Sequence, residues 1–233
     1  MVPHTTRSPR LGKPWARLVG GARRGLPWRR GGIPALALWV LAALGGCATT
    51  GPDVQYYVLA PLPSGSNSKG LDRVVGVGPV DLPQYLNRPQ IVTRAGENQL
   101  TLAEFHRWAE PLEVNVAAVL AQNLTALLDG TTVAAFPWPA ETTPDYRIRV
   151  TISRFEGDSD GNVSLVARWQ LVDLQGQELQ RGNALLGAAF VPPTDGEWDY
   201  GALVGAMNRV LGELSQDLAR ALRRLADPRG SPP

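Results

Sequence analysis

YRIRVTISRFEGDSDGNVSLVARWQLVDLQGQELQRGNALLGAAFV (146–191) decides the fold, because apolar and polar residues alternate along most of it. A period of two predicts half-buried strands. The alternation is interrupted at 157–162, where Gly, Asp and Asn are typical of a hairpin turn. It resumes from Val163 to Leu171, and a third strand is expected over 179–191. The stretch therefore predicts three neighbouring strands of one sheet.

Two segments change to helical spacing. From Pro111 to Leu128 apolar residues recur every three or four positions, and Asp129-Gly130 follows as a stop signal. A second apolar face runs from Tyr200 to Leu225, with Asp199 as its candidate N-cap. We therefore expect two amphipathic helices.

Shorter apolar runs predict five more strands, at residues 54–60, 72–82, 89–93, 99–102 and 132–136. Residues 95–98 (AGEN) are expected to form a hairpin turn between the third and fourth of these. A mixed or antiparallel sheet packed by two amphipathic helices is a single compact α/β domain, with the α+β class as the alternative.

The single cysteine, Cys47, marks the N-terminal region as an export signal. Residues 1–30 carry eight Lys or Arg and no acid, and the apolar run IPALALWVLAAL follows at 33–44. A basic segment, a short apolar run and small residues before a cysteine are typical of a bacterial lipobox. The run is too short to span about 30 Å of hydrocarbon comfortably, so a retained transmembrane helix is the second choice.

We expect cleavage between Gly46 and Cys47, which makes residues 1–46 a lipoprotein signal peptide. Cys47 would then carry diacylglycerol and an N-acyl chain, because two or more chains anchor a protein stably and one does not. Ala48 rather than Asp follows the cysteine, which points to the outer membrane, with the protein facing the periplasm. With its thiol acylated, the chain has none left for a disulfide or a redox centre, and no cofactor is expected.

The export signal also dominates the charge. The chain has 23 Lys and Arg against 21 Asp and Glu, and removing the eight basic residues of the signal leaves 15 against 21, a net charge near −6. Nucleic-acid binding therefore loses its main support. We expect a lipid-anchored tether over 47–53, one domain over 54–227 and a disordered tail over 228–233.

His106, the one histidine after the signal, is a weak catalytic candidate. A zinc site needs several N, S or O ligands, and no second His or free Cys follows. No G-x-S-x-G elbow is present either, although a lipid-tethered periplasmic hydrolase using His106 with a nearby Glu or Ser stays as the alternative. We expect His106 to pack beside Trp108, and Glu104, Arg107 and Glu110 to form an ion-pair cluster at a helix entrance.

Other chemical signals are weaker still. DSDGN (158–162) hints at a calcium loop but lacks the distal Glu of an EF-hand, so a hairpin turn is expected. Gly76-Val77-Gly78 lacks the third glycine and the helix of a phosphate loop. The four tryptophans after the signal are scattered, so core and interface roles suffice. No catalytic or metal-binding residue is assigned.

LPQYLNRPQIVTR (82–94) differs from a plain linker. Pro83 and Pro89 stiffen its path, which leaves Tyr85, Leu86 and Arg88 to be presented outward or docked. This composition indicates an ordered loop and a possible contact surface.

LPQYLNRPQIVTR (82–94) followed by EFHRWAEPL (104–112) resembles the ABC-type transport auxiliary lipoproteins of the paraquat-inducible intermembrane-transport type. The likeness continues through RFEGDSDGNVSLVARWQLVD (154–173) and the closing helix, and so covers nearly all of 54–225. It implies one α/β domain, lipid-anchored in the outer membrane, that works beside mammalian-cell-entry (MCE) proteins carrying lipids between the two membranes. It also implies an accessory, partner-binding role with no catalytic residues to carry over.

Tyr85, Arg88 and Trp108 are the residues that we expect at an interface, or supporting one. The partner would be an MCE protein or a second copy in a homo-oligomer. Trp108 has the alternative of filling the core under the first helix. A further alternative for the whole chain is an assembly lipoprotein of another envelope complex.

The lipobox interpretation is tested by Cys47→Ser. Because Cys47 is the sole thiol in the chain, the substitution should abolish incorporation of labelled palmitate and release or mislocalise the protein. Incorporation equal to that of the wild type would contradict the lipoprotein assignment.

Overall fold

The computed structural model describes residues 51–63, 70–194 and 196–226. The predicted signal peptide, its cleavage site at Gly46 and Cys47, and the tail at 228–233 lie outside these residues. Gly51, where the description begins, is four positions after Cys47.

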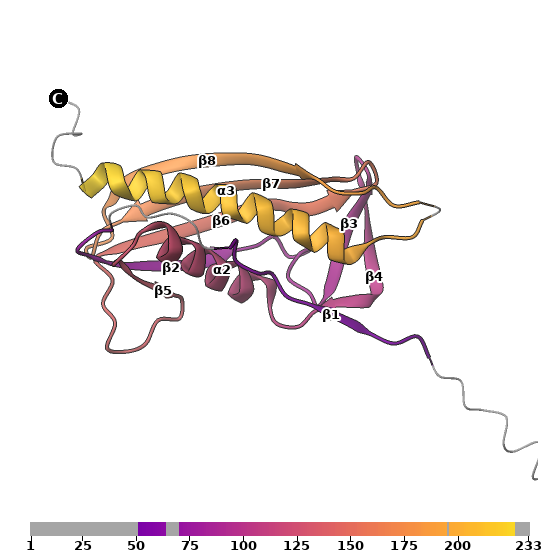
Figure 1. Cartoon of the computed structure of the whole chain (residues 1–233), viewed down its shortest axis with the longest axis horizontal. Helices are drawn as coiled ribbons and strands as arrows, with labels where there is room; N and C mark the ends of the chain where they lie inside the picture. Colours follow the sequence, from indigo (N-terminus) through magenta and orange to yellow (C-terminus); the bar gives the residue numbers. More distant parts are fainter. Residues whose placement is uncertain (1–50, 64–69, 195, 227–233) are drawn as a thin grey trace, which may run out of the picture. The chain divides into compact units, whose positions relative to one another are not determined.

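β6 (Tyr146–Asp158) is the strand around which a single eight-stranded sheet assembles (Figure 1). One edge of β6 pairs antiparallel with β7 (Asn162–Val172), which in turn pairs antiparallel with β8 (Glu178–Ala189). The other edge pairs in succession with β2 (Val74–Asp81) and β3 (Gln90–Gly96), both parallel. The three strands predicted within 146–191 are therefore confirmed.

The sheet is extended by three more strands. β4 (Gln99–Trp108) pairs antiparallel with β3, β1 (Gln55–Tyr57) pairs parallel with β4, and β5 (Thr132–Ala135) pairs parallel with β2. Parallel and antiparallel pairs thus coexist, so of the two predicted alternatives, a mixed or an antiparallel sheet, the mixed sheet is present.

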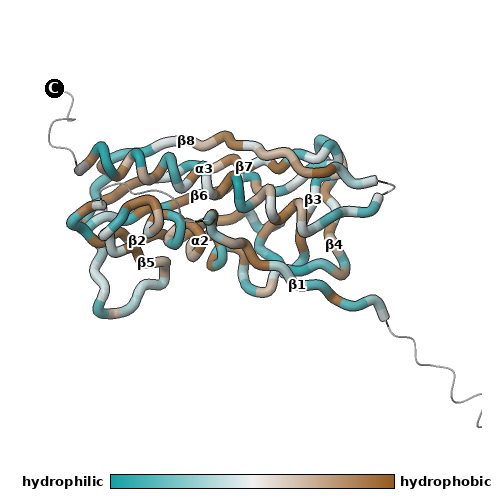
Figure 2. Tube along the Cα trace, viewed as in Figure 1, coloured by the Kyte–Doolittle hydropathy of each residue, from teal (hydrophilic) through white to brown (hydrophobic). Residues whose placement is uncertain are grey.

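α2 (Leu112–Leu127) and α3 (Tyr200–Ala226) contact each other and cover one face of the sheet (Figure 1). α2 packs on β2 and β5, and α3 packs on β6, β7 and β8. α2 is hydrophobic over most of its length, whereas α3 alternates hydrophilic and hydrophobic residues (Figure 2). The predicted α/β class with two packed helices is confirmed.

The predicted helix boundaries are also confirmed. Pro111 is the N-cap of α2, where its missing N–H removes no helical hydrogen bond, and its carbonyl accepts from the N–H of Val114 at 3.1 Å. Asp199 caps α3, because its Oδ1 accepts from the N–H of Ala202 at 2.9 Å.

The first strand is shorter than the predicted 54–60. The backbone N–H groups of Leu59, Ala60 and Leu62 bond to asparagine side chains of the helices rather than to a neighbouring strand. Leu59 donates to Asn115 at 2.6 Å, and Ala60 donates to Asn208 at 3.1 Å. A ladder cannot continue once its donors are used elsewhere, so β1 ends at Tyr57.

The strand predicted at 99–102 instead runs to Trp108 as β4, because its second half pairs with both β3 and β1. Residues 104–108 are therefore strand and not a helix entrance. The ion-pair cluster expected there is wrong: in the described part of the chain, Glu104, Arg107 and Glu110 form no salt bridge. Glu110 instead accepts a hydrogen bond from the amide of Asn115 at 2.6 Å.

Gly182 on β8 lies directly opposite Trp169 on β7, and its missing side chain makes room for the indole ring. A Cβ at Gly182 would stand 2.3 Å from the Cζ2 of Trp169. Trp169 is buried in the core as a result.

Within the described residues, neither helix combines the length and the apolar character that a membrane span requires.

Gly182→Ala should lower the free energy of unfolding by about 1–3 kcal/mol, because the new methyl group overlaps a ring that is fixed in the core. Gly187→Ala is the matched control on the same strand, since its Cβ would meet only the carbonyl oxygen of Val163, at 3.3 Å. Urea-induced unfolding followed by circular dichroism compares the two. An equal effect of both substitutions would contradict the proposed packing.

Candidate functional site

The segment from Leu82 to Pro89 connects β2 to β3 and is an ordered turn. Pro83 accepts backbone hydrogen bonds from Leu86 at 2.9 Å and from Asn87 at 3.3 Å. Leu86 is buried in the core. Pro89 accepts from the backbone N–H of Trp108 at 2.7 Å, so the two stretches that carry the family resemblance lie side by side.

The buried carboxylate of Glu156 on β6 fastens this connection to the sheet. Its Oε1 accepts from the Nη2 and Nε of Arg94 at 2.6 and 2.9 Å. Its Oε2 accepts from the hydroxyl of Tyr85 at 2.9 Å and from the backbone N–H of Phe155 at 3.0 Å. Arg154 adds a longer contact at 3.6 Å. Both carboxylate oxygens are thereby satisfied without water, as a buried charge requires.

A β-bulge at Ser153 determines which way Glu156 points. The register of β6 against β7 shifts between Ile152 and Arg154, which moves the buried alternation by one residue. A Cβ at Gly157 would lie 2.4 Å from Leu203 of α3, so Gly157 faces the helices. Neighbouring residues of a strand face opposite sides, and Glu156 therefore faces the side that carries Tyr85 and Arg94.

Tyr85 is held as a hydrogen-bond donor. Burial, and next its hydrogen bond to the carboxylate of Glu156, raise the pKa of Tyr85 to about 12. Because the folded-state pKa is raised, the stabilisation from this proton is present below about pH 10 and is lost as the pH rises through about 12. The phenol is therefore neutral under physiological conditions.

The three predicted interface residues differ in their surroundings. Trp108 is 6% exposed and lies in the hydrophobic core. Tyr85 is half-buried, with its hydroxyl directed at Glu156 rather than outward. Arg88 is also half-buried. Tyr85 and Arg88 remain the predicted contact residues. Trp108 is buried, so it can support such a contact only by packing in the core.

His106 hydrogen-bonds through its Nδ1 to the hydroxyl of Tyr57 at 2.9 Å and stacks on Tyr200, with ring centroids 4.0 Å apart. Burial lowers the pKa of His106, so its ring is held neutral. Among the hydrogen bonds of the described residues, none joins His106 to a Ser, Asp or Glu, as a catalytic triad would require.

The rings around His106 belong to a row that the sequence did not indicate. Phe190 stacks on Trp198 at 5.9 Å and Trp198 stacks on Tyr200 at 6.2 Å, so the row runs from Phe190 through Trp198, Tyr200 and His106 to Tyr57. The sequence interpretation treated the tryptophans as scattered. The row unites three segments that are far apart along the chain, and therefore has no local signal.

The segment 158–162 is a hairpin turn, as expected. The Oδ1 of Asp158 accepts from the N–H groups of Asp160 and Asn162 at 3.0 and 2.9 Å, which is an Asx-type turn. In the part of the chain that the structure describes, no three His, Cys, Asp or Glu side chains gather at a distance suited to a metal ion.

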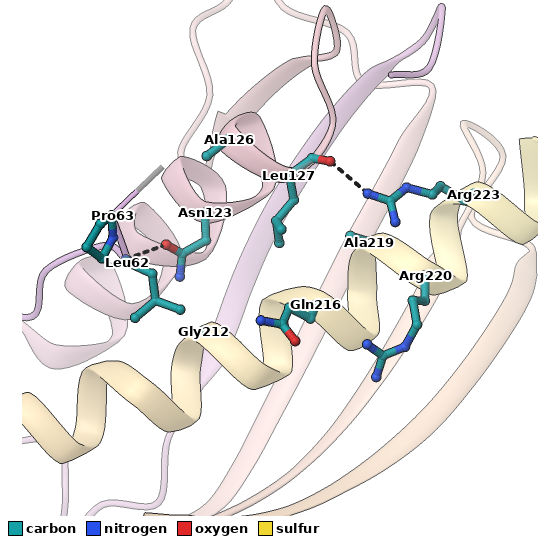
Figure 3. Close-up of a pocket in the computed structure, with 10 residues that line it drawn as sticks. All are labelled: Leu62, Pro63, Asn123, Ala126, Leu127, Gly212, Gln216, Ala219, Arg220 and Arg223. Carbon is teal, nitrogen blue, oxygen red and sulfur yellow. Dashed lines mark hydrogen bonds between the residues drawn. The ribbon is translucent and has the colours of Figure 1, made fainter. Parts of the chain in front are cut away.

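A groove of about 390 Å³ lies between α2 and α3 beside Leu62 (Figure 3). Arg223 donates to the carbonyl of Leu127 at 2.8 Å, and Arg220 pairs with Asp217. Both arginines thus already have partners within the protein. The residues that directly follow Pro63 lie outside the description, so we assign no ligand to this groove.

Comparison with known proteins agrees with this architecture. The family model of the ABC-type transport auxiliary lipoprotein component matches residues 57–219. The chain is 30% identical over 196 residues to the intermembrane transport lipoprotein PqiC of Escherichia coli (strain K12), covering 83% of this chain and 97% of that protein. The PqiC of Shigella flexneri gives the same values.

Two crystal structures share the fold. A protein described as uncharacterized is 24% identical, with a TM-score of 0.60, and the match covers 73% of this chain and 99% of that one. A Xanthomonas campestris protein is 14% identical, with a TM-score of 0.54, and the match covers 70% of this chain and 92% of that one. At these identities the likeness concerns the fold alone.

Glu156→Gln should lower the free energy of unfolding by roughly 2–3 kcal/mol, because it leaves the half-buried Arg94 without its countercharge. Arg181→Gln is the control, since it removes an exposed pair with Glu178 that is worth at most about 1 kcal/mol. Urea-induced unfolding measures both. A loss for Glu156→Gln no larger than that of the control would show that Glu156 does not hold the connection.

Proposed function

Because the chain belongs to the family of ABC-type transport auxiliary lipoproteins, we propose that it is a lipid-anchored, non-enzymatic component of a system that moves lipids between the two membranes of the cell envelope. The observation that carries the proposal is the family match over 57–219, together with 30% identity to PqiC along nearly its whole length. The name of that relative describes intermembrane transport, and the proposal extends this role to the present chain.

The anchor is proposed at Cys47, in the inner leaflet of the outer membrane, with the domain in the periplasm. The lipobox pattern and Ala48 after the cysteine support this location. Palmitate on the N-terminal cysteine and on its diacylglycerol would provide the two or more chains that stable attachment needs.

A non-enzymatic role is supported by the side chains of the described domain. His106 is hydrogen-bonded to Tyr57 and stacked on Tyr200. Both carboxylate oxygens of Glu156 accept hydrogen bonds from neighbouring side chains. Neither group is left free to act as a base on a substrate.

The proposed partner is the MCE-domain protein of the same transport system, bound by the connection from Leu82 to Pro89. The hydrogen bond from Tyr85 to Glu156 and the backbone bonds to Pro83 fix this connection before any partner arrives, so little conformational entropy is lost on binding. Arg88 is half-buried and adjoins Pro89, so it can offer a guanidinium to the partner from a stiff backbone.

The test is co-purification of the MCE protein with the full-length lipoprotein from cells. Tyr85→Ala combined with Arg88→Ala should weaken the association about tenfold or more, the scale of one or two interface anchors. Arg88→Glu should act in the same direction without touching the bonds of Glu156. Arg181→Ala combined with Leu185→Ala is the matched control, because it removes an exposed Arg and a large apolar side chain from β8.

Thermal unfolding of each variant checks that the domain is intact. Unchanged association of both folded variants would reject this surface as the contact. Failure of the wild-type lipoprotein to retain the MCE protein would reject the proposed partner itself.

A further inference from the structure

The aromatic row of Tyr57, His106, Tyr200, Trp198 and Phe190 is neither fully in the core nor fully exposed. Each of the five side chains is half-buried, and the four that are not histidine pack against the hydrophobic core with part of the ring. Rings with one apolar side and one wet side are typical of surfaces that meet a lipid bilayer.

Apolar side chains continue from the row into solvent. Tyr56, the neighbour of Tyr57 on the edge strand β1, is 65% exposed. Val191, which follows Phe190, is 71% exposed. Accessible apolar groups therefore lie next to both ends of the row along the chain: Val191 follows Phe190, and Tyr56 lies on the opposite face of the same edge strand as Tyr57.

The position of Cys47 places the row near the membrane. Tyr57 is ten positions after Cys47, and an extended chain covers at most about 3.3–3.6 Å per residue, so Tyr57 lies within roughly 35 Å of the acylated residue. Gly51 and Asp53, which lead to the row, are exposed.

The opposite end of the domain is separated from the row by the length of α3. α3 starts at Tyr200 within the row and continues for 27 residues, which at a rise of 1.5 Å is about 40 Å. In Figure 1 the start of α3 and the strand β1 lie at the same end of the described unit, and the C-terminus of α3 lies at the other. The tether thus favours contact through the end that carries the row.

We propose that the aromatic row, with Tyr56 and Val191, rests in the interfacial region of the membrane that holds the lipid anchor and binds a zwitterionic phospholipid surface. This inference rests on the proposed acylation of Cys47. Contact by the row would set the orientation of the domain, which a lipid anchor alone does not determine.

The charges at this end favour zwitterionic over anionic lipid. Asp53, Glu104, Glu197 and Asp199 are exposed on the segments that carry the row. They outnumber two basic residues, the half-buried Arg107 beside Tyr56 and the exposed Arg209, which donates to the carbonyl of Ala189 next to Phe190. Anionic headgroups would be repelled by this acidic rim. The row itself carries no formal charge at neutral pH, because burial lowers the pKa of His106 and raises the pKa of Tyr57 and Tyr200.

The test uses the acylated protein, inserted through its own lipid into phosphatidylcholine vesicles with or without bromine on the upper part of the acyl chains. Bromine quenches tryptophan on contact, so the emission of Trp198 should fall in brominated vesicles. Trp198→Phe should abolish that loss, because Trp108 and Trp169 are buried and Trp138 lies in the loop after β5, away from the start of α3 (Figure 1).

Tyr56→Ser combined with Val191→Ser should reduce the quenching with little change in thermal stability, since both side chains are exposed. Leu185→Ser, which alters a side chain that is 83% exposed in the middle of β8, should leave quenching unchanged. Adding phosphatidylglycerol to the vesicles should weaken the contact.

Absence of quenching in a protein that incorporates labelled palmitate would overturn the contact and leave the anchor standing. Quenching that appears only with phosphatidylglycerol, or that Leu185→Ser removes, would overturn it as well. Absence of palmitate from the wild-type protein would instead overturn the anchor proposed for the function.

Discussion

The bulge at Ser153 on β6 and the carboxylate of Glu156 together organise the sheet. β6 is paired along one edge with β7 and along the other with β2 and β3, so a shift of one residue in its register changes which side chains face the helices. The bulge turns Gly157 toward α3 and Glu156 away from it. Glu156 can then bind Arg94 and Tyr85, which joins the connection between β2 and β3 to the centre of the sheet.

This arrangement gives the domain two surfaces with different physical character. The connection from Leu82 to Pro89 is stiff and polar, with its backbone fixed by internal hydrogen bonds. The aromatic row is apolar and half-buried, and it ends at Tyr57 on β1, the strand that follows the tether in the sequence. In the proposed function the first surface serves a protein partner, and in the further inference the second serves the membrane. A domain that holds both on one sheet can position a partner relative to a bilayer.

Local periodicity was sufficient to predict both helices and the hairpin at 158–162, because each follows from residues close together in sequence. The sheet was predicted only as mixed or antiparallel, since the parallel pairs of β6 with β2 and β3 join segments far apart in the chain. The extent of β1 was not predictable, since it depends on Asn115 and Asn208 taking donors that would otherwise extend a strand. The hydrogen bonds of Glu156 and the aromatic row were not predicted either, because each joins segments that only the tertiary fold brings together. The stretch 82–94 was identified as ordered, but the inward direction of Tyr85 was not foreseen.

The central claim is that the Glu156-fixed connection contacts an MCE partner in the envelope. A photo-crosslinking amino acid placed at Arg88 of the full-length lipoprotein in living cells tests it most directly, with Leu185 on β8 as the control position. Light should produce an adduct from position 88 that contains the MCE protein and none from position 185. A folded, membrane-anchored protein that gives no such adduct from position 88, or gives it only from position 185, would contradict the account.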